Sequence, residues 1–177
     1  MTSKLSGKVA LVAGGSAGVG LGIAKRFAEE GARVFITGRR QSELDKAVTA
    51  IGGGATAVQG DVSNLDDLDR IYATIKAKTR HIDVLAVNAG YYEFGRFGEI
   101  TEEHFDKTLN TNVRGLLFTV QKALPLLTEG ASVILTGSIA SIKGFPSLSV
   151  YNASKAAVRS FARSWIATSR GVAFAST

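Results

Sequence analysis

Residues 8–20 read Lys-Val-Ala-Leu-Val-Ala-Gly-Gly-Ser-Ala-Gly-Val-Gly, and this stretch decides the fold. The run Lys8–Ala13 is apolar after its first residue and predicts a strand. A helical pattern follows the glycines, so a tight turn should join the strand to a helix. Such a turn lets backbone N–H groups approach a pyrophosphate, whose charge the helix N-terminus stabilises.

The spacing of the glycines leaves the function of this turn open. It is Gly14-x-x-x-Gly18-x-Gly20 and not G-x-G-x-x-G, so an ordinary glycine-rich loop is the alternative. If the turn binds a dinucleotide, its contacting residues are Gly14, Ser16, Ala17, Gly18, Val19 and Gly20.

Four further apolar runs repeat the strand pattern: Arg33–Thr37, Thr56–Gln59, Asp83–Val87 and Ala131–Thr136. The segments between them carry apolar residues at three- and four-residue steps, which predicts helices, the longest within Thr101–Thr128. Continuously apolar strands are typical of a parallel sheet covered on both faces. We therefore expect an α/β fold, a doubly wound parallel sheet (Rossmann fold) in three layers α/β/α. Residues 1–177 should form a single dinucleotide-binding domain.

Composition excludes several classes of function. The chain has 177 residues, no cysteine and two histidines, so we expect neither a disulfide nor a metal site. The formal charge is +6, but the basic residues are scattered and do not alternate with aromatic ones, so we expect no nucleic-acid partner. The short polar start and the lack of a long apolar run predict a cytoplasmic protein with no membrane partner.

The end of the second predicted strand indicates which cofactor would bind. An acidic residue about 20 positions after the glycines normally binds the ribose 2′-hydroxyl of NAD. Gly38 stands at that point here, and Arg39 and Arg40 follow it. Because the arginine fork suits a 2′-phosphate, NADP(H) should be preferred, with NAD(H) possible. Two exposed arginines at the start of a helix are the alternative.

Tyr151 and Lys155 lie four residues apart in the last helical pattern, which places them on one helix face. A neighbouring ammonium favours the phenolate of a tyrosine and brings proton exchange with an alcohol or ketone oxygen within reach. Ser138 follows the fifth predicted strand, at the sheet edge where open parallel sheets place their ligands. The three residues are therefore candidates for one catalytic site.

The glycine-rich turn, the second strand end and the Ser138, Tyr151 and Lys155 positions follow one another between about Ser6 and about Ser169. Taken in this order, they resemble the motifs of the short-chain dehydrogenase/reductase family, in its subgroup with single-domain subunits. The family's glycine motif is similar to that of Gly14, Gly18 and Gly20, although threonine is usual where Ala13 stands. The other matching positions are Asp61 and Val62 near the adenine, Asn88, Ala89 and Gly90 after the fourth strand, Asn112 and Gly115 in the long helix, and the triad Ser138, Tyr151 and Lys155.

The resemblance implies a role for each residue of the catalytic site. Tyr151 would be the acid/base, Ser138 would hold the substrate oxygen, and Asn112 would support a water leading to Lys155. Lys155 would hold the nicotinamide ribose and tune Tyr151, so both residues would also contact the cofactor. The implied reaction interconverts a ketone and a secondary alcohol by hydride transfer with NADP(H). A 3-oxoacyl carrier-protein reductase and a sugar or alcohol dehydrogenase are special cases.

The C-terminal part departs from the family pattern. Related subunits continue past the Tyr151 helix into a sixth strand, a substrate-covering loop and a seventh strand, whereas here Gly171–Thr177 is a candidate stub of the sixth. We expect a fold truncated after this helix, with apolar sheet surface and an edge exposed. A cofactor-binding pseudoenzyme or an inactive truncated fragment is therefore an alternative. Gly38 and the glycine spacing disfavour a methyltransferase or a nucleotide-sugar epimerase.

Apolar and aromatic residues surround the expected substrate position: Tyr91, Tyr92, Phe94, Ile139, Phe145 and Pro146. They predict a small-molecule carbonyl or alcohol substrate with hydrophobic parts, although loop residues that pack on one another give the same pattern.

A stripe of small residues follows the Tyr151 helix: Ala153, Ala157, Ser160 and Ser164. Small residues let a second helix approach closely, and Phe161 and Trp165 lie beside the stripe. Family members pair this helix and the long one before it across a two-fold axis, so the resemblance implies a homodimer or homotetramer. Alternatively, the stripe faces this chain's own sheet.

Overall fold

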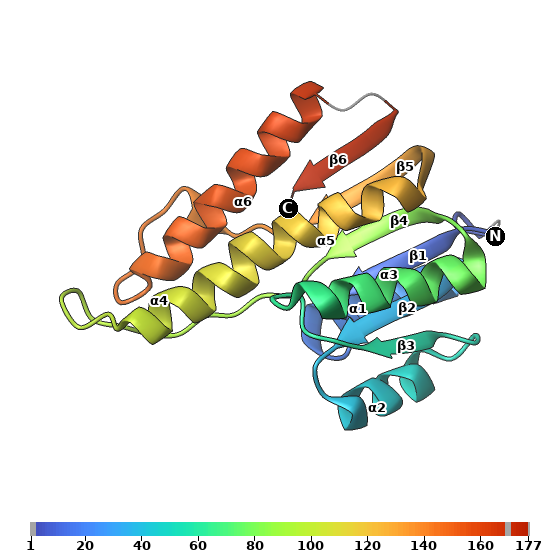
Figure 1. Cartoon of the computed structure of the whole chain (residues 1–177), viewed down its shortest axis with the longest axis horizontal. Helices are drawn as coiled ribbons and strands as arrows, with labels where there is room; N and C mark the ends of the chain where they lie inside the picture. The colour runs from blue at the N-terminus through green and yellow to red at the C-terminus, as the bar shows by residue number, and fades with distance from the viewer. Residues whose placement is uncertain (1–2, 169–170, 177) are drawn as a thin grey trace.

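The computed structural model describes residues 3–168 and 171–176. Six parallel strands form one sheet in the order β3-β2-β1-β4-β5-β6 (Figure 1). The strands are β1 (Val9–Ala13), β2 (Arg33–Gly38), β3 (Thr56–Gln59), β4 (Ile82–Val87), β5 (Leu127–Leu135) and β6 (Val172–Ser176). This is the strand order of the doubly wound Rossmann fold, so the expected fold class is confirmed.

Helices cover both faces of the sheet. One face packs against α1 (Gly18–Glu29) and α2 (Gln41–Ile51), and the other against α3 (Leu65–Thr79), α5 (Leu116–Ala123) and α6 (Ser149–Thr168). The two apolar clusters lie on opposite sides of β1 and β2, because alternate strand residues such as Phe35 and Ile36 enter different clusters. The three-layer arrangement therefore follows from strands that are apolar on both faces.

The centre of the sheet contains the topological switch point. β1 and β4 are hydrogen-bonded neighbours, yet β1 leads into α1 on one face and β4 leads through α4 (Glu102–Leu109) into α5 on the other. The two connections diverge and leave a crevice beyond the carboxyl ends of these strands. Open parallel sheets bind their ligands at this place.

The long helix expected within Thr101–Thr128 is interrupted and shorter. A π-helical stretch, Asn110–Gly115, separates α4 from α5, and a 3-10 turn, Leu124–Leu126, follows. Leu127 and Thr128 already belong to β5, so the prediction that the fifth strand begins at Ala131 is wrong. The early part of β5 contains polar and exposed residues and pairs with β4 through a register shift, which an apolar pattern does not reveal.

β6 follows the Tyr151 helix, as expected for a stub of the sixth strand. The candidate stub forms a parallel strand on β5 from Val172 to Ser176; Thr177 lies outside the described residues. Phe174 packs toward Trp165 of α6, whereas Ala173 and Ala175 are exposed on the other face. Within the described residues β6 is the edge strand of the sheet, and its Ala173 and Ala175 side is exposed. Among the described residues no helix is long and apolar enough to cross a bilayer.

Candidate active site

The turn between β1 and α1 requires glycine at two positions. Gly14 has a φ of +81°, and a Cβ there would lie 2.6 Å from the Ala89 backbone nitrogen. A Cβ on Gly20 would lie 2.0 Å from the Gly14 carbonyl oxygen, so α1 closely approaches the turn. The helix begins without a side-chain cap or an acidic residue in its first turn. Its first amides are therefore available to an anion.

A cavity of about 630 Å³ opens at the carboxyl ends of β1, β2 and β4. The predicted cofactor-binding residues that line it are Gly14, Ser16, Ala17, Gly38, Arg39, Arg40, Asp61, Val62, Asn88, Ala89 and Gly90. The predicted residues Gly18, Val19, Gly20, Tyr151 and Lys155 do not line it. Thr37, Gly60 and Thr111 also line the cavity and were not predicted. Thr37 and Gly60 lie at the carboxyl ends of β2 and β3. Their positions at strand ends could therefore have predicted that they line the cavity.

The lining of this cavity fits a nicotinamide dinucleotide. The Thr37 hydroxyl is buried and has no hydrogen-bond partner within the described ranges. Leaving a buried hydroxyl without a partner costs about 1–3 kcal/mol, so a ligand that bonds to it would be favoured. Glycine backbone, an uncapped helix N-terminus and this hydroxyl are the donors and acceptors that phosphates and riboses need.

The residues expected to distinguish the cofactors, Gly38, Arg39 and Arg40, line the cavity. A Cβ on Gly38 would lie 2.8 Å from the Ser16 hydroxyl, so a carboxylate side chain would crowd the turn. The Arg39 guanidinium lies 3.9 Å from the Asp61 carboxylate and is 64% exposed, which makes this pair weak. Asp61 also accepts hydrogen bonds from the Ser63 amide and hydroxyl, which fix its carboxylate beside the cavity.

Lys155 is buried beside Tyr151. It is 5% exposed, its Nζ donates to the Thr136 carbonyl oxygen (2.8 Å), and Nζ lies 5.8 Å from the centroid of the Tyr151 ring. Burial lowers the pKa of the Lys155 ammonium. Because lysine is rarely buried without a specific reason, the position indicates a functional group held at the end of β5.

Asn112 anchors the loop after β4. Its Oδ1 accepts from the Tyr91 amide (2.7 Å), and its Nδ2 donates to the Tyr91 carbonyl (2.8 Å) and to the Ser154 hydroxyl (2.9 Å). The side chain reaches these partners from the π-helical stretch, a local distortion that is frequent at functional sites. The geometry makes Asn112 a positioning residue between this loop and α6, a role that the sequence did not indicate.

Ser138 precedes the short 3-10 turn Ile139–Ser141 and caps it by accepting from the Ala140 amide (3.1 Å). This turn packs against α6, which carries Tyr151. No hydrogen bond joins Ser138 to Tyr151 in the described part of the chain. Ser138 therefore lies just beyond the carboxyl-terminal end of β5, next to a turn that packs against α6.

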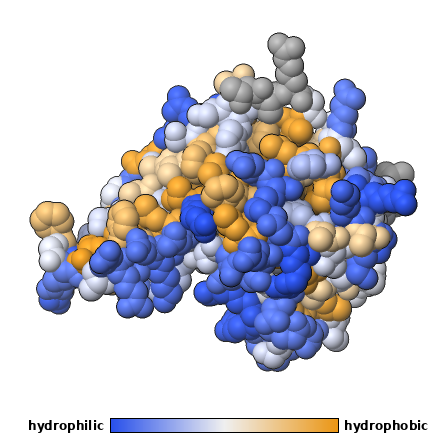
Figure 2. Space-filling view, in the orientation of Figure 1, coloured by the Kyte–Doolittle hydropathy of each residue, from blue (hydrophilic) through white to orange (hydrophobic). Residues whose placement is uncertain are grey.

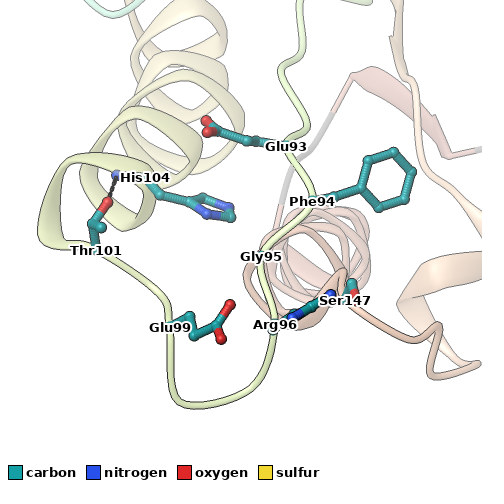
Figure 3. A pocket seen from close by; sticks show the side chains of 8 residues that line it. All are labelled: Glu93, Phe94, Gly95, Arg96, Glu99, Thr101, His104 and Ser147. Atoms are coloured by element: carbon teal, nitrogen blue, oxygen red, sulfur yellow. Dashed lines mark hydrogen bonds between the residues drawn. The ribbon is translucent and has the colours of Figure 1, made fainter.

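A second cavity, of about 410 Å³, lies between the start of α4 and the loop 93–99. Figure 3 shows His104 extending from α4 toward Gly95, while Phe94 points away from it. The His104 Nε2 is buried without a partner among the residues described. On the same loop, the Gly95 amide donates to the Ser147 carbonyl (2.9 Å), which ties the loop to the segment that leads into α6.

Comparison with known proteins agrees with this geometry. The sequence profile of the family described as short chain dehydrogenase matches residues 8–171. The chain therefore belongs to the short-chain dehydrogenase family, as the resemblance implied. This membership agrees with the sequence motifs, which disfavour a methyltransferase or a nucleotide-sugar epimerase.

Individual related proteins are longer than this chain. Oxidoreductase asL5 of Sarocladium schorii is 50% identical over 169 residues, which are 94% of this chain and 68% of the relative. The NADP-dependent (R)-specific alcohol dehydrogenase of Lentilactobacillus kefiri is 37% identical over 93% of this chain and 67% of its own length. A short-chain dehydrogenase/reductase structure from Serratia marcescens superposes with a TM-score of 0.93 at 28% identity, covering 97% of this chain and 73% of that one. Over eight of the curated relatives, this chain spans 61–68% of their length.

Proposed function

We propose that this chain forms the cofactor-binding and catalytic part of an NADP(H)-dependent oxidoreductase that interconverts a ketone and a secondary alcohol. The observation that carries the proposal is the buried Lys155 beside Tyr151, next to the dinucleotide-sized cavity. A buried ammonium is costly to maintain and is common where a neighbouring group must exchange a proton.

Each residue has a distinct part in this proposal. Tyr151 transfers the proton to or from the substrate oxygen, and Ser138 donates a hydrogen bond that holds this oxygen. Lys155 stabilises the phenolate by its charge and binds the ribose next to the nicotinamide. When bound, the nicotinamide supplies a hydride to the carbonyl carbon or accepts one from the alcohol.

Asn112 acts through other residues. Its amide is already bonded to Tyr91 and Ser154, so it positions the loop after β4 against α6. This assignment differs from the water-supporting role that the family resemblance implied.

NADP(H) is the proposed cofactor because Gly38 and Arg39 face the cavity where a carboxylate would select NAD. The one NADP-dependent relative named above supports this choice. An arginine–phosphate contact contributes about 1.5–3 kcal/mol, which predicts a preference of roughly tenfold or more.

Fluorescence titration with NADPH and NADH tests the cofactor proposal. Arg39→Asp should reverse the preference. Lys76→Asp, an identical change of charge on the exposed side of α3, should leave it unchanged. Equal affinities of the unmodified protein for the two cofactors would contradict the proposal.

NADPH oxidation with a panel of ketones separates an active reductase from a pseudoenzyme or an inactive fragment. A reductase should oxidise NADPH only when a ketone is present, whereas the two alternatives bind NADPH without turnover.

Assembly through α5 and α6 is part of the same proposal. Ala153, Ser160 and Ser164 are exposed and Ala157 is half-buried, whereas Val158 and Ala162 face the sheet. The alternative that the stripe faces this chain's own sheet is therefore wrong. Figure 2 shows an apolar band across the region of α4, α5 and α6. An isologous contact along this band would form a homodimer, and a second contact a homotetramer.

A further inference from the structure

Tyr92 is an exposed aromatic residue beside the proposed acid/base. Its ring centroid lies 6.1 Å from that of Tyr151, with an interplanar angle of 67°. On its other side lies Phe94, with centroids 6.0 Å apart and an angle of 89°. Tyr92 and Phe94 are 63% and 67% exposed, so neither ring belongs to the core. Two aromatic rings therefore extend outward from Tyr151 along one side of the site.

The backbone that carries Tyr92 is fixed at both ends. Asn112 bonds the amide and the carbonyl of Tyr91, and the Gly95 amide bonds to Ser147. Both anchors connect the loop to α6 or to the segment before it, so the loop and Tyr151 are held in one frame. A surface fixed in this way needs little ordering when a ligand binds, which favours affinity.

The chemistry of the Tyr92 side chain indicates what it would bind. Its hydroxyl has no hydrogen-bond partner in the described ranges, in contrast to Tyr91, whose hydroxyl donates to Glu93 and whose ring lies under Lys107. The Tyr92 ring already makes an edge-to-face contact with Tyr151, of the kind that aromatic pairs prefer. On the Ser138 side, Ile139 and Ile142 are exposed apolar residues with no charge.

We propose that Tyr92 determines specificity by contacting an aromatic ring of the ketone substrate, so that the substrate class is a ketone bearing an aryl group near its carbonyl. This inference rests on the proposed function. An aromatic pair contributes about 0.5–1.5 kcal/mol more than its buried area, which corresponds to a selectivity of roughly two- to tenfold. A saturated ring of the same size buries similar area without this contribution.

The test compares 4-phenyl-2-butanone with 4-cyclohexyl-2-butanone, because their carbonyl groups have nearly the same intrinsic reactivity. The measured quantity is the ratio of kcat/KM for the aryl ketone to that for the saturated one. Tyr92→Leu should lower this ratio roughly two- to tenfold, mostly through KM. Tyr92→Phe should retain the ratio, because only the ring is required. Phe97→Leu is the matched control, since Phe97 is a fully exposed aromatic residue in the same loop.

The outcomes separate the inference from the function on which it rests. If both ketones are reduced and Tyr92→Leu leaves the ratio unchanged, the inference is overturned while the function stands. If neither ketone is reduced, neither is a substrate, and the panel of ketones described above decides the proposed function. Calorimetric binding of 4-phenyl-2-butanol and 4-cyclohexyl-2-butanol to the protein with NADP+ then decides the inference. A selective loss of the aryl alcohol in Tyr92→Leu supports it, and an equal loss or no loss overturns it.

Discussion

Two glycines of α1 offer a direct test of how the turn is built. A Cβ on Gly20 would lie 2.0 Å from the Gly14 carbonyl oxygen and 2.7 Å from the Asn88 Nδ2, both of which belong to the cavity wall. Gly22 lies two residues later in the same helix, and a Cβ there would meet nothing within 4 Å. Gly20→Ala and Gly22→Ala are thus the same chemical change in one helix with opposite packing consequences.

The structure gives the sign and the magnitude of both effects. Gly22→Ala should stabilise the protein by about 0.5–1 kcal/mol, because alanine restricts the unfolded chain and favours the helix. Gly20→Ala gains the same amount but must displace the turn, and forced overpacking costs about 1–3 kcal/mol or more. The expected net change is a destabilisation of about 1–2 kcal/mol, or roughly 2–8 °C in Tm for a chain of this size.

Thermal unfolding and NADPH titration measure the two consequences together. Gly20→Ala should lower Tm and weaken NADPH binding at least tenfold, whereas Gly22→Ala should raise Tm and leave binding unchanged. If Gly20→Ala were as stable as Gly22→Ala and bound NADPH normally, the close approach of α1 to the turn would be refuted.

Two further predictions concern the loop anchor and the assembly. Asn112→Ala leaves the Tyr91 amide and carbonyl without their side-chain partner, so urea unfolding should show a loss of about 2–4 kcal/mol; a loss below about 0.5 kcal/mol would mean that the loop is not anchored there. Ala157→Arg places a charge in the small-residue stripe, so light scattering should show a dimer for the unmodified protein and a monomer for the variant. A dimeric variant, or a monomeric unmodified protein, would count against assembly through α6.

The sequence predicts the sheet well because its strands are buried on both faces. Val9–Ala13 and Ile82–Val87 are continuously buried, so apolar runs locate them almost to the residue. β5 is harder to predict, since its early residues are polar and partly exposed. The π-helical stretch also escapes prediction, because one extra residue per turn changes the apolar spacing too little to be read from six residues.

The residues of the candidate site are also of two kinds: some can be predicted from the sequence, and others can be recognised only in the folded chain. Glycines and the Tyr151–Lys155 pair follow fixed spacings within one element, and a sequence reveals such spacings directly. Asn112 depends on Tyr91 and Ser154, which lie 21 and 42 residues away, so its anchoring role requires the folded chain. Thr37 also requires the folded chain, because its buried, unpaired hydroxyl can be recognised as a ligand contact only when β2 is seen to line the cavity.

The central claim is that Tyr151 exchanges the proton during hydride transfer, and Tyr151→Phe tests it most directly. NADPH oxidation in the presence of a ketone should be followed spectrophotometrically for the unmodified protein and the variant, together with the NADPH dissociation constant of each. The account predicts that the variant loses at least a hundredfold in kcat while it binds NADPH with nearly unchanged affinity, since general acid catalysis contributes about 10²–10⁴-fold. A variant that keeps most of the unmodified rate would contradict the assignment of Tyr151.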